Sequence, residues 1–221
     1  MIDYFIPVII LAVIGMVLQG FFIAVDHKGK YAPAVFFKGS AAMVFVVIGF
    51  LADKNLLICL GLTFGMIGDI LLALRYNFRN NTNKVFMMAG SFMFFIGHIM
   101  YIAAEIPESW NLKISISIGV GVAAVILYII YKNVELDKLY KAFGVFYIGV
   151  VSIMTAIAVG NVIHDGSAFR IWFAVGAVLF TVSDVIMVLN GRLRNAFLRG
   201  MNLSLYYVGQ LLIALSMFFI E

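Results

Sequence analysis

The sequence is short of charge. Only 12% of its 221 residues are Asp, Glu, Lys or Arg, while 64% are apolar. A soluble domain needs a charged surface around its core, so this composition excludes an ordinary soluble globule. Lipid accepts such a chain, provided that the backbone bonds within helices or a closed barrel. The apolar runs are about twenty residues long and do not alternate with polar residues, which excludes a barrel.

Cysteine, proline and metal-ligand patterns are also scarce. The single cysteine, Cys59, can form no internal disulfide and carries no information on redox compartment. The three prolines lie near the ends of apolar runs. We find no His-Glu-x-x-His or paired-Cys pattern, no Gly-rich phosphate loop and no nucleophile elbow. We therefore expect no metal and no cofactor.

The apolar runs predict an all-α bundle of eight transmembrane helices that forms a single transmembrane domain over residues 1–221. We expect the first run to be a retained helix, because it lacks the basic segment and the cleavage site of a signal peptide. The predicted spans, each about as long as a bilayer requires, are 5–25, 34–52, 56–74, 85–104, 113–131, 140–159, 171–190 and 202–220.

The basic residues predict the orientation of the bundle. Eleven of the fifteen Lys and Arg residues follow spans 1, 3, 5 and 7, namely Lys28, Lys30, Arg75, Arg79, Lys84, Lys132, Lys138, Lys141, Arg192, Arg194 and Arg199. Only three lie on the other side, Lys54, Lys113 and Arg170, and Lys38 falls within a span. This positive-inside bias predicts cytoplasmic odd-numbered connections and non-cytoplasmic termini, in the cell (inner) membrane. The pI of about 9.2 is then a topology signal, and we expect no nucleic acid partner.

Two pairs of segments resemble each other within the chain. The segment "FGMIGDILLALRYNFRN" (64–80) aligns without gaps to "LFTVSDVIMVLNGRLRN" (179–195), which pairs Asp69 with Asp184. In the following spans "MFFIGHIMYIA" (93–103) resembles "LYYVGQLLIAL" (205–215), which pairs His98 with Gln210. The spacing suggests two parallel four-helix repeats, although apolar helices also resemble one another by chance.

Three charged side chains are predicted to share one layer of the membrane. Ionisable groups within spans are costly and by default face the interior of a bundle. From the rise of a helix, Asp69, Asp184 and Lys38 lie about 6, 5 and 7 Å from their span centres, all toward the cytoplasm. The alternative to a site is a structural ion pair. However, one Lys cannot balance two carboxylates, so one should be ionised and the other protonated, as acid–base work requires.

Other polar residues lie in or near the same half of the bundle. His98 can serve as a proton shuttle, a headgroup contact or an interhelical hydrogen-bonding residue. Tyr147, Asn190 and Tyr206 are candidate substrate contacts, although each can equally serve packing or the membrane interface. Arg75 and Arg192 end the two Asp-bearing spans, where they can anchor the topology or hold a lipid phosphate.

At these residues the sequence resembles the YhhN family, the membrane proteins that include the lysoplasmalogenases. The resemblance extends over essentially the whole chain, and is carried by "GMIGDILLAL" (65–74), "GSFMFFIGHIMYI" (90–102) and "VGAVLFTVSDVIMVLN" (175–190). It implies a lysophospholipid substrate, whose vinyl ether is hydrolysed to a fatty aldehyde and glycerophospho-ethanolamine or -choline. By motif position it implies that Asp69 and Asp184 are essential.

The carboxyl chemistry agrees with that activity, because a vinyl ether is cleaved by protonation of its β-carbon and stabilisation of the resulting cation. Three other functions remain open. A transporter or flippase of small lipids or ions would place the Asp pair in its translocation path. A metal-dependent amidase or esterase of the alkaline ceramidase type needs several intramembrane His ligands, and only His98 is within a span. The third is a non-catalytic scaffold.

Overall fold

A computed structural model describes residues 2–135 and 137–220, without the side chains of residues 2–5, 80 and 192. Within those residues the chain forms eight α-helices, all long and apolar enough to cross a membrane, as a multi-pass membrane protein requires. The helices are α1 (Ile2–His27), α2 (Tyr31–Ala52), α3 (Leu56–Leu74), α4 (Asn80–Glu105), α5 (Leu112–Asn133), α6 (Lys138–His164), α7 (Ala168–Leu193) and α8 (Ala196–Ser216). The 3₁₀ turns η1 (Arg75–Asn77), η2 (Ile106–Glu108) and η3 (Met217–Phe219) follow α3, α4 and α8.

The start of α8 differs most from the predicted spans. It begins at Ala196, six residues before the predicted start at 202, because the Asn195 side chain accepts the backbone N–H groups of Phe197 (2.8 Å) and Leu198 (3.2 Å). A side chain that satisfies these free donors starts a helix whatever the polarity of the next turn. Arg199 and Asn202 lower the mean hydropathy of the first two turns, and the span predicted from hydropathy therefore starts too late.

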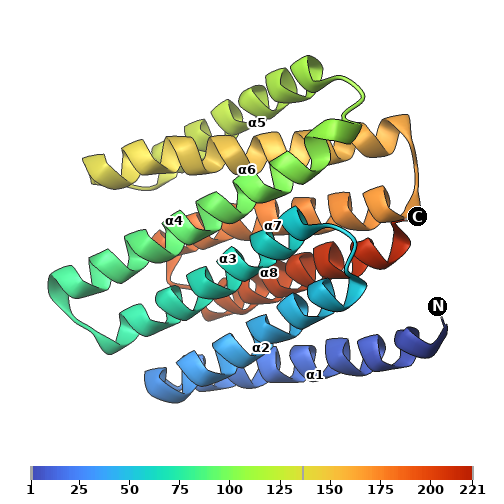
Figure 1. Cartoon of the computed structure of the whole chain (residues 1–221). Helices are drawn as coiled ribbons and strands as arrows, with labels where there is room; N and C mark the ends of the chain where they lie inside the picture. The colour runs from blue at the N-terminus through green and yellow to red at the C-terminus, as the bar shows by residue number, and fades with distance from the viewer. Residues whose placement is uncertain (1, 136, 221) are drawn as a thin grey trace.

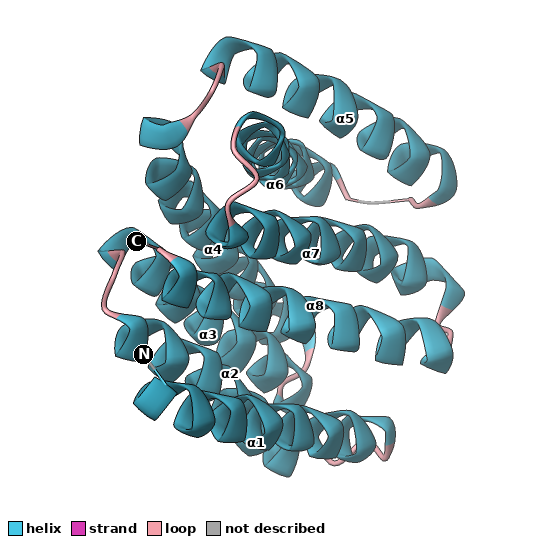
Figure 2. Ribbon diagram, turned by 90° about the vertical axis from the view of Figure 1, so that its right-hand side faces the viewer, coloured by secondary structure: helices cyan, strands magenta, loops and turns pink. Residues whose placement is uncertain are grey.

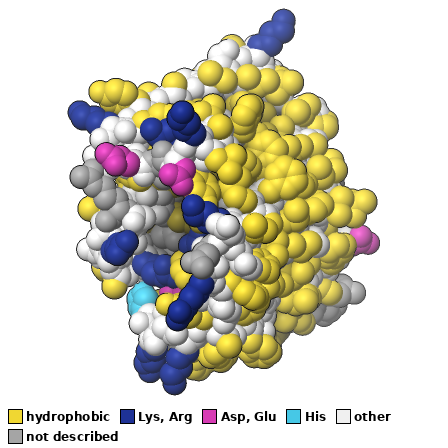
Figure 3. Space-filling view, turned by 90° about the vertical axis from the view of Figure 1, so that its left-hand side faces the viewer, with side chains coloured by type: hydrophobic (Ala, Val, Ile, Leu, Met, Phe, Trp, Pro, Cys, Tyr) yellow, Lys and Arg dark blue, Asp and Glu magenta, His cyan; other side chains and the backbone are white. Residues whose placement is uncertain are grey.

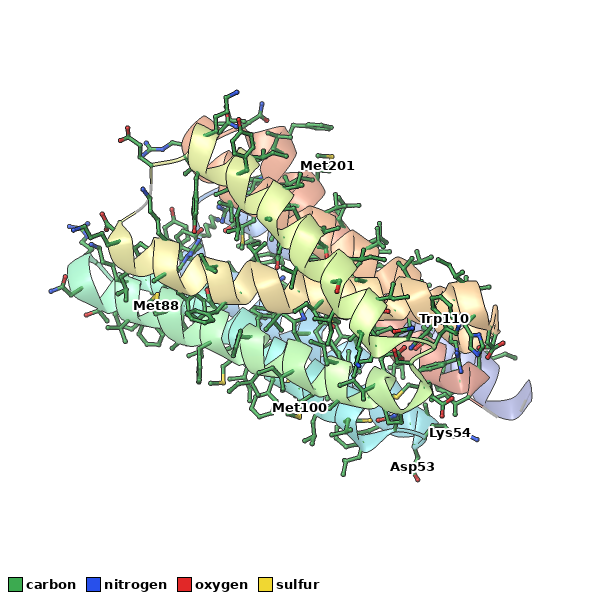
Figure 4. The ribbon with its side chains drawn as sticks, turned by 90° about the horizontal axis from the view of Figure 1, so that it is seen from above. Asp53, Lys54, Met88, Met100, Trp110 and Met201 are labelled. Carbon is green, nitrogen blue, oxygen red and sulfur yellow. The ribbon has the colours of Figure 1, made fainter. Side chains whose placement is uncertain are left out.

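The helices form a flattened bundle with α1 at one edge and α5 at the other (Figures 1 and 2). The two termini lie at the same end (Figure 1). Asp53, Lys54 and Trp110 lie at one end and Met88 lies toward the other (Figure 4). We call the end that carries the connections α1–α2, α3–α4, α5–α6 and α7–α8 the basic end, because most of the Lys and Arg residues are there.

Paired glycines bring two pairs of helices close together. A Cβ atom on Gly97 of α4 would lie 3.0 Å from the carbonyl oxygen of Gly61 in α3. A Cβ atom on Gly176 of α7 would lie 2.6 Å from the carbonyl oxygen of Gly209 in α8. Small residues at such crossings let helix backbones approach closely, which is how helices associate in lipid. These contacts fix α3 against α4 and α7 against α8.

Buried side chains of α8 then tie it to three other helices. Asn202 donates to the Ser183 carbonyl of α7 at 2.7 Å, and the Tyr207 hydroxyl donates to the Ala41 carbonyl of α2 at 3.1 Å. The Tyr101 hydroxyl of α4 donates to Gln210 at 2.7 Å. Such bonds hold well where no water competes. They fix the rotation of α8, which also packs on α1 and α3, and place its polar side in the bundle.

Candidate active site

The first carboxylate of the site is paired with a cation. Lys38 of α2 lies 3.2 Å from Asp69 of α3, and both side chains are buried, at 5% and 4% exposure. The Tyr206 hydroxyl of α8 donates to the other Asp69 oxygen at 2.7 Å, and the Lys38 ammonium lies 4.3 Å from the centre of the Tyr206 ring. Two charges can be buried together where they satisfy each other and their remaining hydrogen bonds. Asp69 therefore has a cation and a hydroxyl donor as partners, which are surroundings that favour the ionised form.

The second carboxyl has a phenol in place of the cation. The Tyr147 hydroxyl of α6 donates to Asp184 of α7 at 2.8 Å. Asp184 is only 5% exposed, and no Lys, Arg or His of the described residues forms an ion pair with it. A buried carboxyl without a counter-charge is held at lower cost as the neutral acid. The two Asp residues thus have different electrostatic surroundings.

Both carboxyl groups line one cavity of about 110 Å³, together with Lys38, Tyr147 and Tyr206. The cavity shares lining residues with two larger spaces at the basic end. A groove of about 930 Å³ runs between α4, α5, α6 and α7, and a basin of about 460 Å³ lies beside the α7–α8 connection. Arg75 and Met187 line all three, so they mark the place where the spaces meet.

The groove and the basin differ in lining. The groove is bordered largely by apolar side chains, among them Met87, Leu127, Phe143 and Val188. Three arginines and one aspartate line the basin among the described residues, namely Arg75, Arg194, Arg199 and Asp26. Lys and Arg side chains surround a hollow at this end of the molecule, next to a broad apolar surface (Figure 3). The two spaces therefore differ in polarity, one largely apolar and the other lined by arginines.

The structure brings six of the nine candidate residues to the lining of the carboxyl cavity. These are Asp69, Asp184, Lys38, Tyr147 and Tyr206, and Arg75 completes the lining at the mouth. Asn190 lines the basin, where it joins α7 to α8 by accepting the Asn195 N–H at 2.8 Å and donating to the Asn195 carbonyl at 3.1 Å. The side chain of Arg192 lies outside the described part of the structure.

His98 lies away from the cavity. Its ring is 1% exposed and packs edge-on against Phe180, with 4.6 Å between the ring centres. Phe180 lines the cavity and His98 does not. Neither ring nitrogen has a hydrogen-bond partner among the described residues. His98 therefore belongs to the aromatic layer beneath the cavity, next to Tyr101 and Tyr147.

Sequence reasoning missed Arg199, Tyr76 and Asp26, which line the mouth of the cavity. Arg199 was counted only as a connection residue. A usable signal was present, because Arg199, Asn202, Tyr206 and Gln210 recur at helical spacing and form one polar side of α8. No group of three or more His, Cys, Asp or Glu side chains that could hold a metal ion occurs within the described residues.

The fold and the site define a multi-pass membrane protein with two buried carboxyl groups at an internal cavity. The model of the YhhN family matches residues 30–217, which is most of the chain. The protein therefore belongs to the YhhN family, which includes lysoplasmalogenases. No solved structure matches the chain.

Proposed function

We propose that this protein is a membrane-embedded hydrolase that cleaves the vinyl ether bond of lysoplasmalogens. Its products would be a fatty aldehyde and glycerophosphoethanolamine or glycerophosphocholine. Family membership supports the reaction class. The observation that carries the proposal is the presence of two buried carboxyl groups on one cavity, one paired with a lysine and the other with a tyrosine.

Protonation of carbon is the difficult step of this reaction, and Asp184 is suited to it. The Asp184 acid gives its proton to the β-carbon of the vinyl ether, and the π electrons of the double bond form the new C–H bond. The α-carbon and the ether oxygen then share the positive charge of an oxocarbenium ion. The ionised Asp69 stabilises this cation, since a carboxylate in a site without bulk water acts strongly on developing charge.

Water completes the reaction. It adds to the α-carbon and gives a proton to the Asp184 carboxylate, which restores the acid and leaves a hemiacetal. In the collapse of the hemiacetal, its hydroxyl loses a proton, the bond from the α-carbon to the glycerol oxygen breaks, and that oxygen gains a proton. One water is consumed, and each carboxyl group ends in its starting state. The assignment of roles follows from the partners, because Asp69 is paired with a cation and Asp184, among the described residues, is not.

A layer of aromatic rings favours the hydrolase over a transporter. Beneath the cavity His98, Phe180, Tyr101 and Phe173 are almost completely buried and pack edge-on or at a tilt to one another. All three spaces lie toward the basic end of this layer. A transporter with the Asp pair in its path needs access from both sides in turn. Three spaces on one side of a layer of buried rings suit a reaction site with access from that side.

The proposal includes an orientation, with the basic end in the cytoplasm. Eleven basic residues against three support it through the positive-inside rule. Reporter fusions in the α1–α2 and α3–α4 connections should then read as cytoplasmic. Fusions at Asp53 and at Glu108 should read as external. A cytoplasmic reading at Asp53 would contradict this orientation.

Turnover of a lysolipid panel by the purified protein tests the proposed function. The panel contains alkenyl, alkyl and acyl lysophospholipids with the same headgroups, and both aldehyde and free fatty acid are measured. We expect aldehyde from the alkenyl lipids alone, because only a vinyl ether yields a stabilised cation on protonation. Release of fatty acid from the acyl lipids would identify an esterase instead. Absence of turnover in the whole panel, with protein that remains folded, would count against a hydrolase.

A further inference from the structure

Two guanidinium groups converge on one hydroxyl at the mouth of the carboxyl cavity. Arg75 donates to the Tyr76 hydroxyl oxygen at 2.5 Å, and Arg199 donates to the same oxygen at 3.2 Å. The guanidinium carbons lie 4.6 and 5.2 Å from the centre of the Tyr76 ring. Tyr31 stacks on that ring, with 5.3 Å between the ring centres. The position of the Tyr76 hydroxyl is therefore fixed by contacts from α2, η1 and α8.

The two arginines differ in their charge balance. Arg199 makes a bidentate pair with the buried carboxylate of Asp26, at 2.6 and 2.8 Å. Arg75 pairs with no carboxylate among the described residues. Because the Tyr76 oxygen accepts from both arginines, its own proton is free to bond outward, and no described residue accepts it. The mouth thus holds one positive charge without a carboxylate partner, on Arg75. Donors from both arginines converge on the Tyr76 hydroxyl.

We propose that Arg75, Arg199 and Tyr76 bind the phosphate of a single-chain glycerophospholipid. A phosphate offers several anionic oxygens and accepts bidentate bonds from guanidinium groups, which present their donors as a rigid fork. It can also take the outward proton of Tyr76. Asp26 holds Arg199 in position, and it balances only one of the two cations. The assignment rests on the proposed function, since it places the headgroup of the same substrate.

The spacing along α3 fits this class of lipid. Arg75 follows Asp69 by six residues, which is about 9 Å along a helix. In a 1-alkenyl glycerophospholipid, seven bonds separate the phosphorus from the β-carbon, or about 8 Å at the rise per bond of an extended chain. A phosphate at Arg75 therefore brings the vinyl ether to the depth of the carboxyl groups. The alkenyl chain continues into the apolar groove between α4, α5, α6 and α7.

Binding of a lipid that cannot react tests the phosphate site. The probe is a saturated 1-alkyl glycerophosphate, titrated calorimetrically into the full chain in detergent. Arg75→Gln should weaken binding about tenfold to a hundredfold, because bonds between charged partners are lost. Arg79→Gln is the matched control, since Arg79 is an exposed arginine at the same end that lines none of the three spaces, and it should bind like the parent.

A second variant guards against misfolding. Arg199→Gln alone would leave Asp26 buried without its cation. The double variant Asp26→Asn with Arg199→Gln removes both charges and should also weaken binding about tenfold or more. Inorganic phosphate and the alkyl glycerol without phosphate form the other arms of the titration. Each should bind much more weakly than the complete lipid, because each makes only part of the contacts.

The outcomes separate this inference from the proposed function. Equal binding of the lipid by the parent, Arg75→Gln and the double variant would overturn the phosphate site. Inorganic phosphate that binds as tightly as the lipid would overturn its assignment to a lipid headgroup. If the alkenyl lipid yields no aldehyde but the dependence on Arg75 persists, the phosphate site stands and the hydrolase proposal fails. Moving the vinyl ether two bonds further from the phosphate should abolish turnover and leave binding within a few-fold.

Discussion

The helix pairs α2–α3 and α6–α7 both place a carboxyl group at the same cavity, but they surround it differently. Asp69 and Asp184 occupy matching positions in the two similar segments. The helix before Asp69 supplies the ammonium of Lys38, whereas the helix before Asp184 supplies the phenol of Tyr147. Two similar backbones thus hold one carboxyl group paired with a cation and one paired with a phenol. The neighbouring helix, and not the Asp-bearing segment, sets this difference.

The helix contacts beside the two carboxyl groups also correspond. Gly61 aligns with Gly176 and Gly97 aligns with Gly209, and both pairs form a close backbone contact. A duplicated four-helix unit would have these contacts in both halves, although the duplication itself stays a prediction. The two halves share a close glycine contact between helices, but the partner of the Asp is a lysine in one half and a tyrosine in the other. Variants can therefore test packing and charge separately.

The carboxyl groups give the largest expected effect. Asp69→Asn and Asp184→Asn should each lower aldehyde release about a hundredfold to ten-thousandfold, which is the range of general acid–base catalysis. The double variant should lose little more, because the two residues act as a unit. Aldehyde release from an alkenyl lysolipid is the measurement. Near-normal turnover by either single variant would disprove the two-carboxyl mechanism.

The two single variants should differ in stability. Asp184→Asn breaks no ion pair, while Asp69→Asn leaves Lys38 buried without its counter-charge. The control for Asp69→Asn is therefore the double variant with Lys38→Met, which removes both charges. It should melt nearer to the parent and remain inactive. This result would show that the activity lost with Asp69 is not a consequence of unfolding.

The next prediction compares the stability lost with the Lys38 ammonium and the stability lost with the Tyr147 hydroxyl. Lys38→Met should lower the free energy of unfolding by about 3–5 kcal/mol, because it strands a buried carboxylate. Tyr147→Phe removes one neutral donor and should cost about 0.5–1.5 kcal/mol. Denaturant or thermal unfolding in detergent measures both. Equal costs would mean that Asp69 and Asp184 have equivalent surroundings after all.

The glycine contacts give an effect smaller than the loss of Lys38. A Cβ atom on Gly209 would lie 2.8 Å from the Gly176 carbonyl oxygen, and one on Gly97 would lie 3.0 Å from that of Gly61. Both alanine variants should lose about 1–3 kcal/mol of stability through overpacking, with Gly209→Ala the larger. Gly121→Ala is the control, because nothing lies within 4 Å of its Cβ position. It should be neutral or stabilising, since alanine is about 1 kcal/mol better in a helix.

The number of helices and the layer of charged residues followed from the sequence because the bilayer constrains both. Length and hydropathy define a span, and a buried charge must face the bundle. The sequence did not predict that Lys38 pairs with Asp69 and not with Asp184, since this choice depends on the rotation of α2 and α3 about their axes. Depth along a helix can be counted from sequence, but rotation about its axis is set by contacts such as Gly61 with Gly97.

His98 and Arg199 both show that the sequence does not give the direction in which a side chain points. A proton shuttle and a headgroup contact were among the roles predicted for His98, yet its ring packs against Phe180, which lines the cavity where His98 does not. Arg199 was assigned to a connection, yet α8 begins early enough to turn it toward Asp26. One polar cap, Asn195, decides the second case. Hydropathy cannot detect such a cap, because it counts Asn195 only as a polar residue and not as a hydrogen-bond acceptor.

The branching of the internal space at Arg75 and Met187 has a consequence for how the reaction would end. The two proposed products differ sharply in polarity, since one is a long-chain aldehyde and the other a water-soluble phosphodiester. The apolar groove leads along α4 to α7, while the arginine-lined basin opens at the basic end. Each product would leave by the branch that suits it, the aldehyde into the leaflet and the phosphodiester into water. Their separation into two phases would oppose the reverse reaction and keep turnover in one direction.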